Sequence, residues 1–149
     1  MNYYKEIKTE IINNEITKKI KDYSKNRSDL TTYYNVGKLL SEAGKHYGEG
    51  IIKEYSNKLS KDLNKKYSVT TLSYMKQFYE SGIFQPLVGK LSWSHYLQLL
   101  PLKDKDKINY YIDITLKNNL SKRQLCERIK NNEYERLDGV YPLYPVPSY

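Results

Sequence analysis

The sequence predicts an all-α protein, a bundle of about six to seven helices that contains helix–turn–helix-like pairs. Three observations predict this class. Apolar residues recur every three to four positions along most of the 149 residues, short polar segments with capping residues separate these stretches, and no segment alternates as a strand does. The length suits one domain. We therefore expect a helical domain over residues 1–137 and, because three prolines fall within six residues near the end, an extended tail over residues 138–149.

The first two expected helices are marked by different residues, a stripe of isoleucines in the first and an interior glycine in the second. Residues 3–25 carry a stripe of isoleucines, and a polar break follows at residues 26–29, where Ser28 or Asp29 provides a helix cap. The second helix then contains Gly37 in its interior. Glycine there costs about 1 kcal/mol relative to alanine, so we expect that Gly37 allows a neighbouring helix to pack closely. The isoleucines of the first stripe are Ile7, Ile11, Ile12, Ile16 and Ile20.

Two amphipathic segments joined by a short turn form the first helix–turn–helix-like pair. They span residues 51–64 and 68–82, with Ser68 as the expected N-cap and Gly82 as the end of the second helix. The apolar stripe of this second helix is expected to comprise Val69, Leu72, Met75 and Tyr79. Helix–turn–helix proteins place the N-terminal part of such a helix against base edges. Its candidate DNA-contacting residues are Ser68, Thr70, Thr71, Ser73, Tyr74, Lys76 and Gln77.

These side chains suit DNA because glutamine pairs with adenine, threonine meets the thymine methyl, and lysine and serine hold phosphates. A second pair spans residues 104–117 and 121–131, with Asp104 at the start of its first helix and a capping box formed by Ser121 and Gln124. We expect this last helix to run to about Arg136. Its candidate DNA-contacting residues are Lys122, Arg123, Arg128 and Lys130.

The charge, hydropathy and cysteine content of the sequence indicate which partners and which compartment to expect. The net charge of +8 favours polyanionic partners, nucleic acid before anionic membrane. Most cations are lysines in a chain rich in Asn, Lys and Tyr, a composition that low-GC codon usage also produces, so charge alone does not decide between DNA binding and its absence. A mean hydropathy of −0.78 and the lack of an apolar run of about 18 residues predict no spanning helix. No N-terminal signal peptide is recognisable, and the single cysteine suits a reducing compartment, so we expect a cytoplasmic protein without a membrane partner.

Residues for catalysis are scarce. The two histidines, His46 and His95, lie in different elements, and Cys126 beside an apolar residue is expected to be a buried structural thiol. No glycine-rich phosphate loop and no metalloprotease or hydrolase motif is present. We therefore expect no enzyme, no catalytic residue, no cofactor and no metal site.

Several blocks occur in a recognisable order. They are Tyr47-Gly-x-Gly50, Met75-x-Gln-Phe-Tyr79, Leu91-Ser-Trp-Ser-His-Tyr96 and Leu120-Ser-x-Arg-Gln124. With them the chain resembles the N-terminal domain of the YhcG family of bacterial proteins over about two-thirds of its length. The resemblance implies an all-helical, helix–turn–helix-type domain that binds DNA or organises the protein. In that family the domain normally precedes a PD-(D/E)XK nuclease domain, often in loci with restriction–modification genes.

The sequence departs from this family in several ways, and one of them is that its Pro-rich tail does not look like the family's linker. The nuclease site needs an Asp followed by Glu-x-Lys on adjacent strands, and the only Glu-x-Lys here is at residues 6–8, in a predicted helix. Members of this family also usually carry basic residues at several positions of the second helix of the helix–turn–helix. Here Ser73 and Tyr74 of that helix are neutral. The block around Trp93 and His95 has two interpretations: an aromatic anchor of the core in which His95 hydrogen-bonds a backbone group, or a contact surface.

Two functions follow. The first is a non-catalytic DNA-binding domain of a YhcG-like nuclease or restriction-associated system, with DNA as its partner. The alternative is a protein–protein or self-association module that acts as an adaptor for a separate nuclease subunit. The 17 tyrosines and the Pro- and Tyr-rich tail favour the alternative, because tyrosine is enriched at interfaces.

Overall fold

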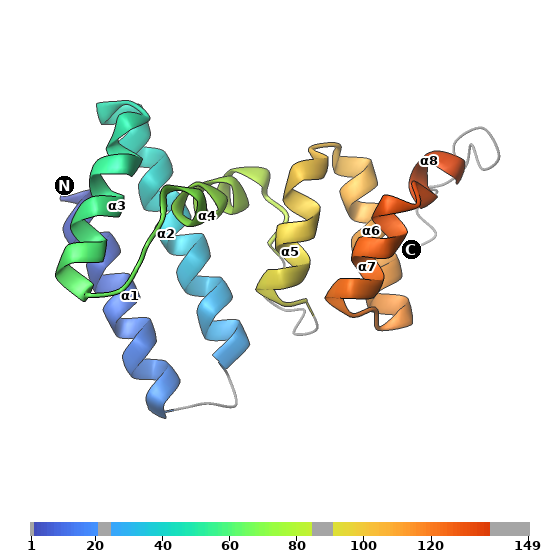
Figure 1. The fold of residues 1–149 in the computed structure, drawn as a ribbon, viewed down its shortest axis with the longest axis horizontal. Coiled ribbons are helices and arrows are strands. Elements are labelled where there is room, and N and C mark those ends of the chain that lie inside the picture. Colours follow the sequence, from blue (N-terminus) through green and yellow to red (C-terminus); the bar gives the residue numbers. More distant parts are fainter. Residues whose placement is uncertain (1, 21–24, 85–90, 138–149) are drawn as a thin grey trace. The chain divides into compact units, whose positions relative to one another are not determined.

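The computed structural model describes residues 2–20, 25–84 and 91–137, and within these ranges the protein is all-α, as the sequence predicts (Figure 1). The described residues form eight α-helices and a short 3-10 helix, with no strand, against the six to seven helices expected. The contacts divide the chain into two compact units, residues 1–89 and residues 90–149. The boundary at residue 137 stays a prediction, and the expected tail over 138–149 lies outside the described residues.

The first unit is built around one long central helix. Helices α1 (Tyr3–Ile20), α2 (Lys25–Tyr47), α3 (Gly50–Leu63) and α4 (Val69–Ser81) follow each other along the chain. Helix α2 packs against α1 and α4, while α3 also contacts both α2 and α4 (Figure 1). The buried side chains fall on the apolar stripe of each helix and include Ile7, Val36, Leu40, Leu59, Leu72 and Phe78.

Three apolar residues of the expected stripes are exposed. Ile12 and Ile16 of α1 are 39% and 52% exposed, and Val69 in the first turn of α4 is 42% exposed. On α1 the buried face contains Ile7 and Ile11. Ile12 follows Ile11 directly and so lies about 100° around the helix, and Ile16 lies about one turn beyond Ile12 on the same exposed side. The expected single stripe of five isoleucines is therefore wrong: Ile7 and Ile11 lie on the buried face, Ile12 and Ile16 do not, and the side chain of Ile20 lies outside the described residues.

Gly37 lies where α2 meets α4. A Cβ atom built on Gly37 would lie 2.0 Å from the backbone oxygen of Met75 and 3.0 Å from the Cβ of Tyr79. Only the absence of a side chain lets the two backbones approach this closely. The close packing expected from the sequence is confirmed.

The ends of the first unit's helices confirm some sequence predictions and correct others. The Ser68 hydroxyl accepts a hydrogen bond from the Thr71 backbone N–H at 3.1 Å, and Gly82 ends α4 with a φ of 70°. The expected break at residues 26–29 is wrong, because α2 already begins at Lys25. Such polar residues are only mildly unfavourable in a helix, so their presence does not stop one that is stabilised by packing.

The second unit contains α5 (Trp93–Leu99), the 3-10 helix η2 (Leu100–Leu102), α6 (Lys105–Asn118), α7 (Lys122–Lys130) and α8 (Glu133–Leu137). Helix α5 packs against α7, and α6, α7 and α8 contact one another. The fully buried side chains of its core include Leu91, Tyr96, Leu99, Leu100, Tyr111 and Leu125. The single last helix expected to run to Arg136 is two helices, because Asn132 adopts a left-handed φ of 55° and ends the first of them.

Candidate nucleic-acid interface

Helix α4 provides the first set of predicted DNA-contacting residues, and several of them serve the fold. Ser68 and Thr71 are half-buried in the helix cap, where their hydroxyls also hydrogen-bond each other at 3.0 Å. Tyr74 is half-buried. Thr70 and Ser73 are exposed and uncharged. The exposed residues of the first turns of α4 are therefore Val69, Thr70 and Ser73, which carry no positive charge.

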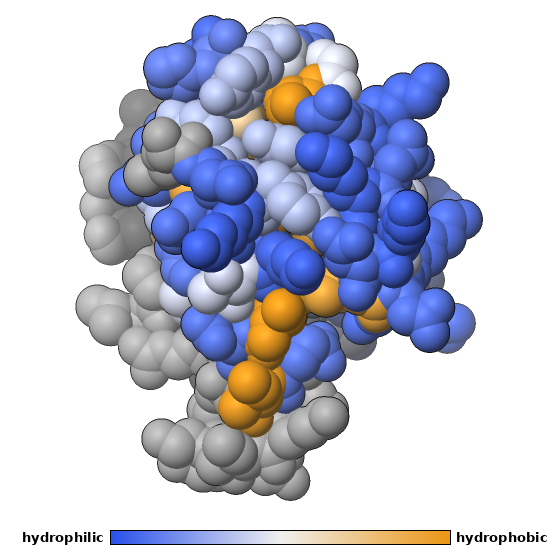
Figure 2. Space-filling view, turned by 90° about the vertical axis from the view of Figure 1, so that its left-hand side faces the viewer, coloured by the Kyte–Doolittle hydropathy of each residue, from blue (hydrophilic) through white to orange (hydrophobic). Residues whose placement is uncertain are grey.

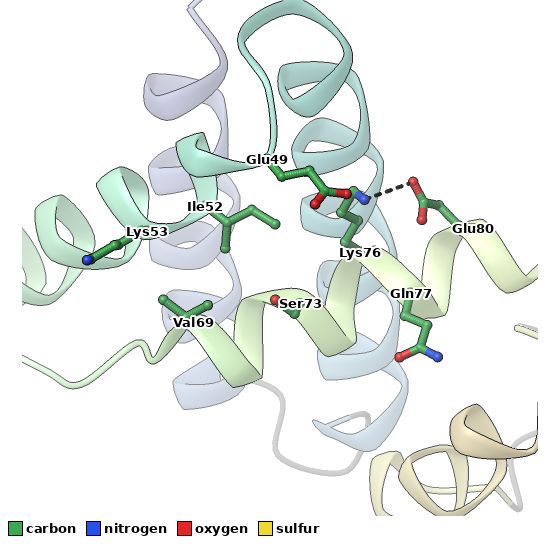
Figure 3. Close-up of a pocket in the computed structure, with 8 residues that line it drawn as sticks. All are labelled: Glu49, Ile52, Lys53, Val69, Ser73, Lys76, Gln77 and Glu80. Carbon is green, nitrogen blue, oxygen red and sulfur yellow. Dashed lines mark ion pairs between the residues drawn. The ribbon is translucent and has the colours of Figure 1, made fainter.

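A groove between α3 and α4 contains the remaining two candidates (Figure 3). The Lys76 Nζ lies 3.4 Å from a carboxylate oxygen of Glu80, and Lys76 is the only cation of α4. Glu80 also accepts a hydrogen bond from the Ser41 hydroxyl at 2.8 Å. This pairing offsets the charge of Lys76, so α4 presents no unpaired cation among the described residues. The groove encloses about 430 Å³ and is lined by Glu49, Ile52, Lys53, Val69, Ser73, Lys76, Gln77 and Glu80.

The turn from α6 to α7 is fixed by backbone and side-chain hydrogen bonds. Asn119 adopts a left-handed φ of 53°, and the Leu120 N–H donates to the Thr115 carbonyl at 3.0 Å. Ser121 and Gln124 then form the expected capping box at the start of α7. The first turn of α7 therefore has a defined orientation within the second unit.

His95 supports the same turn from α5. Its Nδ1 accepts a hydrogen bond from the Ser92 backbone N–H at 3.0 Å, which completes a capping box at the start of α5. Since Nδ1 accepts, the neutral ring carries its proton on Nε2, which donates to the Leu120 carbonyl at 2.8 Å. His95 is buried, and the expected hydrogen bond from it to a backbone group is confirmed.

Helix α7 places its cations at the surface. Lys122, Arg123 and Lys130 are exposed, and none has a carboxylate partner within the described part of the chain. Lys122 and Arg123 stand in the first turn, where the helix dipole favours anions and therefore disfavours cations. Their position does not stabilise the helix, but it suits the binding of an external anion. Lys130 extends the exposed positive charge to the end of α7.

The fourth candidate of α7, Arg128, is neutralised within the protein. It is half-buried, and its Nη1 lies 3.2 Å from Oε1 of Glu133 on α8. Lys107 of α6 pairs in the same way with Glu135 of α8, a contact that sequence reasoning missed. No local signal reveals it, because 28 residues separate the two partners.

The Lys107–Glu135 pair keeps both its charges over a wide pH range. The hydrogen bond from Lys107 lowers the pKa of Glu135 from its ordinary 4.5, and the same bond raises the pKa of Lys107 from its ordinary 10.5. The stabilisation from Glu135 is therefore present above pH 4.5 and is lost as the pH falls through its lowered folded-state pKa. The stabilisation from Lys107 is present below pH 10.5 and is lost as the pH rises through its raised folded-state pKa.

Three other features of the described residues bear on their chemistry. Within the described ranges, no three His, Cys, Asp or Glu side chains are grouped so that they could hold a metal ion. None of the described helices combines the length and the apolar character needed to cross a bilayer. Cys126 is half-buried, so the expectation of a fully buried thiol is wrong, because the buried face of α7 is centred on Leu125.

Comparison with known proteins places the chain in a family. Residues 5–136 match the family model described as DUF1016 N-terminal domain, which agrees with the resemblance to the YhcG-family N-terminal domain. No curated protein and no solved structure gives a significant match. Because the family match covers most of the 149 residues, the chain belongs to the DUF1016 N-terminal domain family.

Proposed function

We propose that this chain is a non-catalytic DNA-binding domain of a YhcG-like nuclease or restriction-associated system, and that α7 is its main DNA contact. One observation carries the proposal: Lys122, Arg123 and Lys130 are exposed on one short helix without carboxylate partners in the described residues. Two of them occupy a turn in which positive charge does not stabilise the helix. Exposed cations are common on protein surfaces, but cations placed against the helix dipole break a local rule, and such places are candidates for functional sites.

The rest of the second unit suits this role. The hydrogen bonds around Leu120 and Ser121 hold the first turn of α7 in place, so little ordering is needed when phosphates bind. The order of helix α6, the connecting turn and α7 supports the proposal that they act as a helix–turn–helix pair. In the first unit, the exposed hydroxyls of Thr70 and Ser73 are proposed as further polar contacts to DNA.

The binding should depend strongly on salt. Each contacted phosphate adds about 0.9 to the slope of log affinity against log salt, so three contacts predict a loss of roughly 40-fold between 50 and 200 mM salt. Fluorescence anisotropy with a labelled duplex of about 20 base pairs measures this directly. A protein that binds neither duplex nor single-stranded DNA at low salt would contradict the proposal.

The alternative function, self-association or an adaptor role, rests on a different observation. Ile12 and Ile16 are exposed one turn apart on α1, and Figure 2 shows an apolar patch on a largely hydrophilic face. If this face pairs two copies, light scattering should give a dimer for the natural protein and a monomer for the Ile12→Glu/Ile16→Glu variant, because buried carboxylates oppose association. A natural protein that stays monomeric at high concentration would rule out pairing through α1.

A further inference from the structure

Helix α8 is joined to α6 and α7 largely through its two carboxylates. The Arg128 Nη1 lies 3.2 and 3.4 Å from the two carboxylate oxygens of Glu133. The Tyr110 hydroxyl also donates a hydrogen bond to Glu133, and Glu135 binds Lys107. Burial, followed by the contact with Glu133, raises the pKa of Tyr110 well above its usual range, so this hydroxyl remains a donor at physiological pH.

Helix α8 also contacts its neighbours through its backbone and through the Tyr134 ring. Helix α8 has five residues, none of them buried. Its backbone is held by a hydrogen bond from the Tyr134 N–H to the Tyr111 hydroxyl at 3.1 Å, and the Tyr134 ring packs against Tyr110 at 5.5 Å between centroids. A helix this short has no stability of its own, so its position depends on these contacts. Another anion can therefore compete with its carboxylates.

We propose that Lys107 and Arg128 form a second phosphate-binding surface, separate from the α7 face that carries Lys122, Arg123 and Lys130, and that the carboxylates of α8 occupy this surface and compete with DNA for it. This inference rests on the proposed function. A guanidinium nitrogen donates to carboxylate and to phosphate oxygens alike, and both Glu133 oxygens accept from the same atom, Nη1 of Arg128. Glu133 thus occupies the position that a DNA phosphate would take on Arg128. Glu135 does the same for Lys107, which the sequence did not single out.

Removing the two competing charges should strengthen DNA binding. The Glu133→Gln/Glu135→Gln variant is expected to bind a labelled duplex at least about fivefold more tightly at 50 mM salt than a control of equal charge, with a salt slope steeper by about 1 to 2. The matched control is Glu6→Gln/Glu54→Gln, which changes two exposed carboxylates of the first unit. Equal net charge in the two variants separates local competition from the overall field of the protein.

A second pair of substitutions tests the proposed surface itself. Adding Lys107→Gln and Arg128→Gln to the Glu133→Gln/Glu135→Gln variant should abolish its increase in DNA affinity. Using Arg128→Lys in place of Arg128→Gln should recover part of this increase. If all proteins bind DNA and the two doubly substituted variants have equal affinity, the competition is overturned while the proposed function stands. If no variant binds, both are overturned.

Discussion

Replacing Gly37 with valine is expected to destabilise the first unit by more than about 3 kcal/mol, because the added side chain meets backbone that cannot move aside. A Cβ at this position would lie 2.0 Å from the Met75 oxygen and 2.8 Å from its carbonyl carbon. Relief requires that α2 and α4 move apart, which would open the core around Leu72 and Phe78. Urea unfolding followed by circular dichroism measures the loss.

Gly44 on the same helix provides the matched control. The nearest atom to a Cβ built on Gly44 is the Cε of Lys76 at 3.8 Å, an ordinary contact at the end of a flexible side chain. Gly44→Ala should therefore stabilise the protein by about 0.5 to 1 kcal/mol, as expected for removing glycine from a helix interior. If the Gly37→Val variant is as stable as the natural protein, α2 and α4 do not pack as described.

Replacing His95 with alanine is expected to cost about 2 to 4 kcal/mol of the free energy of unfolding. The change removes the capping-box acceptor of the Ser92 N–H and leaves the Leu120 carbonyl without its donor from His95. It also leaves a cavity where the buried ring was. Thermal unfolding of the variant, compared with the natural protein, tests this estimate.

Two further substitutions separate the causes. His95→Gln keeps an oxygen that can accept from the Ser92 N–H but is not expected to reach Leu120 in the same way, so its stability should be intermediate. His46→Ala removes the other histidine, which is exposed and has ring contacts to Tyr3 and Tyr47, and should cost less than about 1 kcal/mol. Equal losses for His95→Ala and His46→Ala would refute the role assigned to His95.

Local signals account for the features of the fold that the sequence predicted well. Ser68 and Ser121 cap their helices because a hydroxyl satisfies N–H groups of the first turn, which depends on neighbouring residues alone. Gly82 likewise ends α4 through its own positive φ. The consequence of Gly37 was predictable because an interior glycine is costly without a close neighbour, but its partner, Met75, could be identified only from the structure.

The candidate site was less predictable, because it depends on contacts between distant residues. The pairing of Lys76 with Glu80 has helical i,i+4 spacing and was available from the sequence. The pairing of Arg128 with Glu133 depends on the break at Asn132, which turns the chain back toward α7. The tertiary structure was therefore needed to identify the unpaired cations. Only these unpaired cations favour α7 over α4 as the DNA contact.

The salt dependence of duplex binding by an α7 variant tests the central proposal most directly. Lys122→Gln/Arg123→Gln/Lys130→Gln removes the three exposed cations, and Lys5→Gln/Lys38→Gln/Lys45→Gln removes three exposed lysines of the first unit as a control of equal charge. If α7 is the main contact, the first variant should lower the slope of log affinity against log salt by about 2.7, and the control should change it by less than about 1. Equal slopes for the two variants would show that the overall charge of the protein, rather than α7, determines binding.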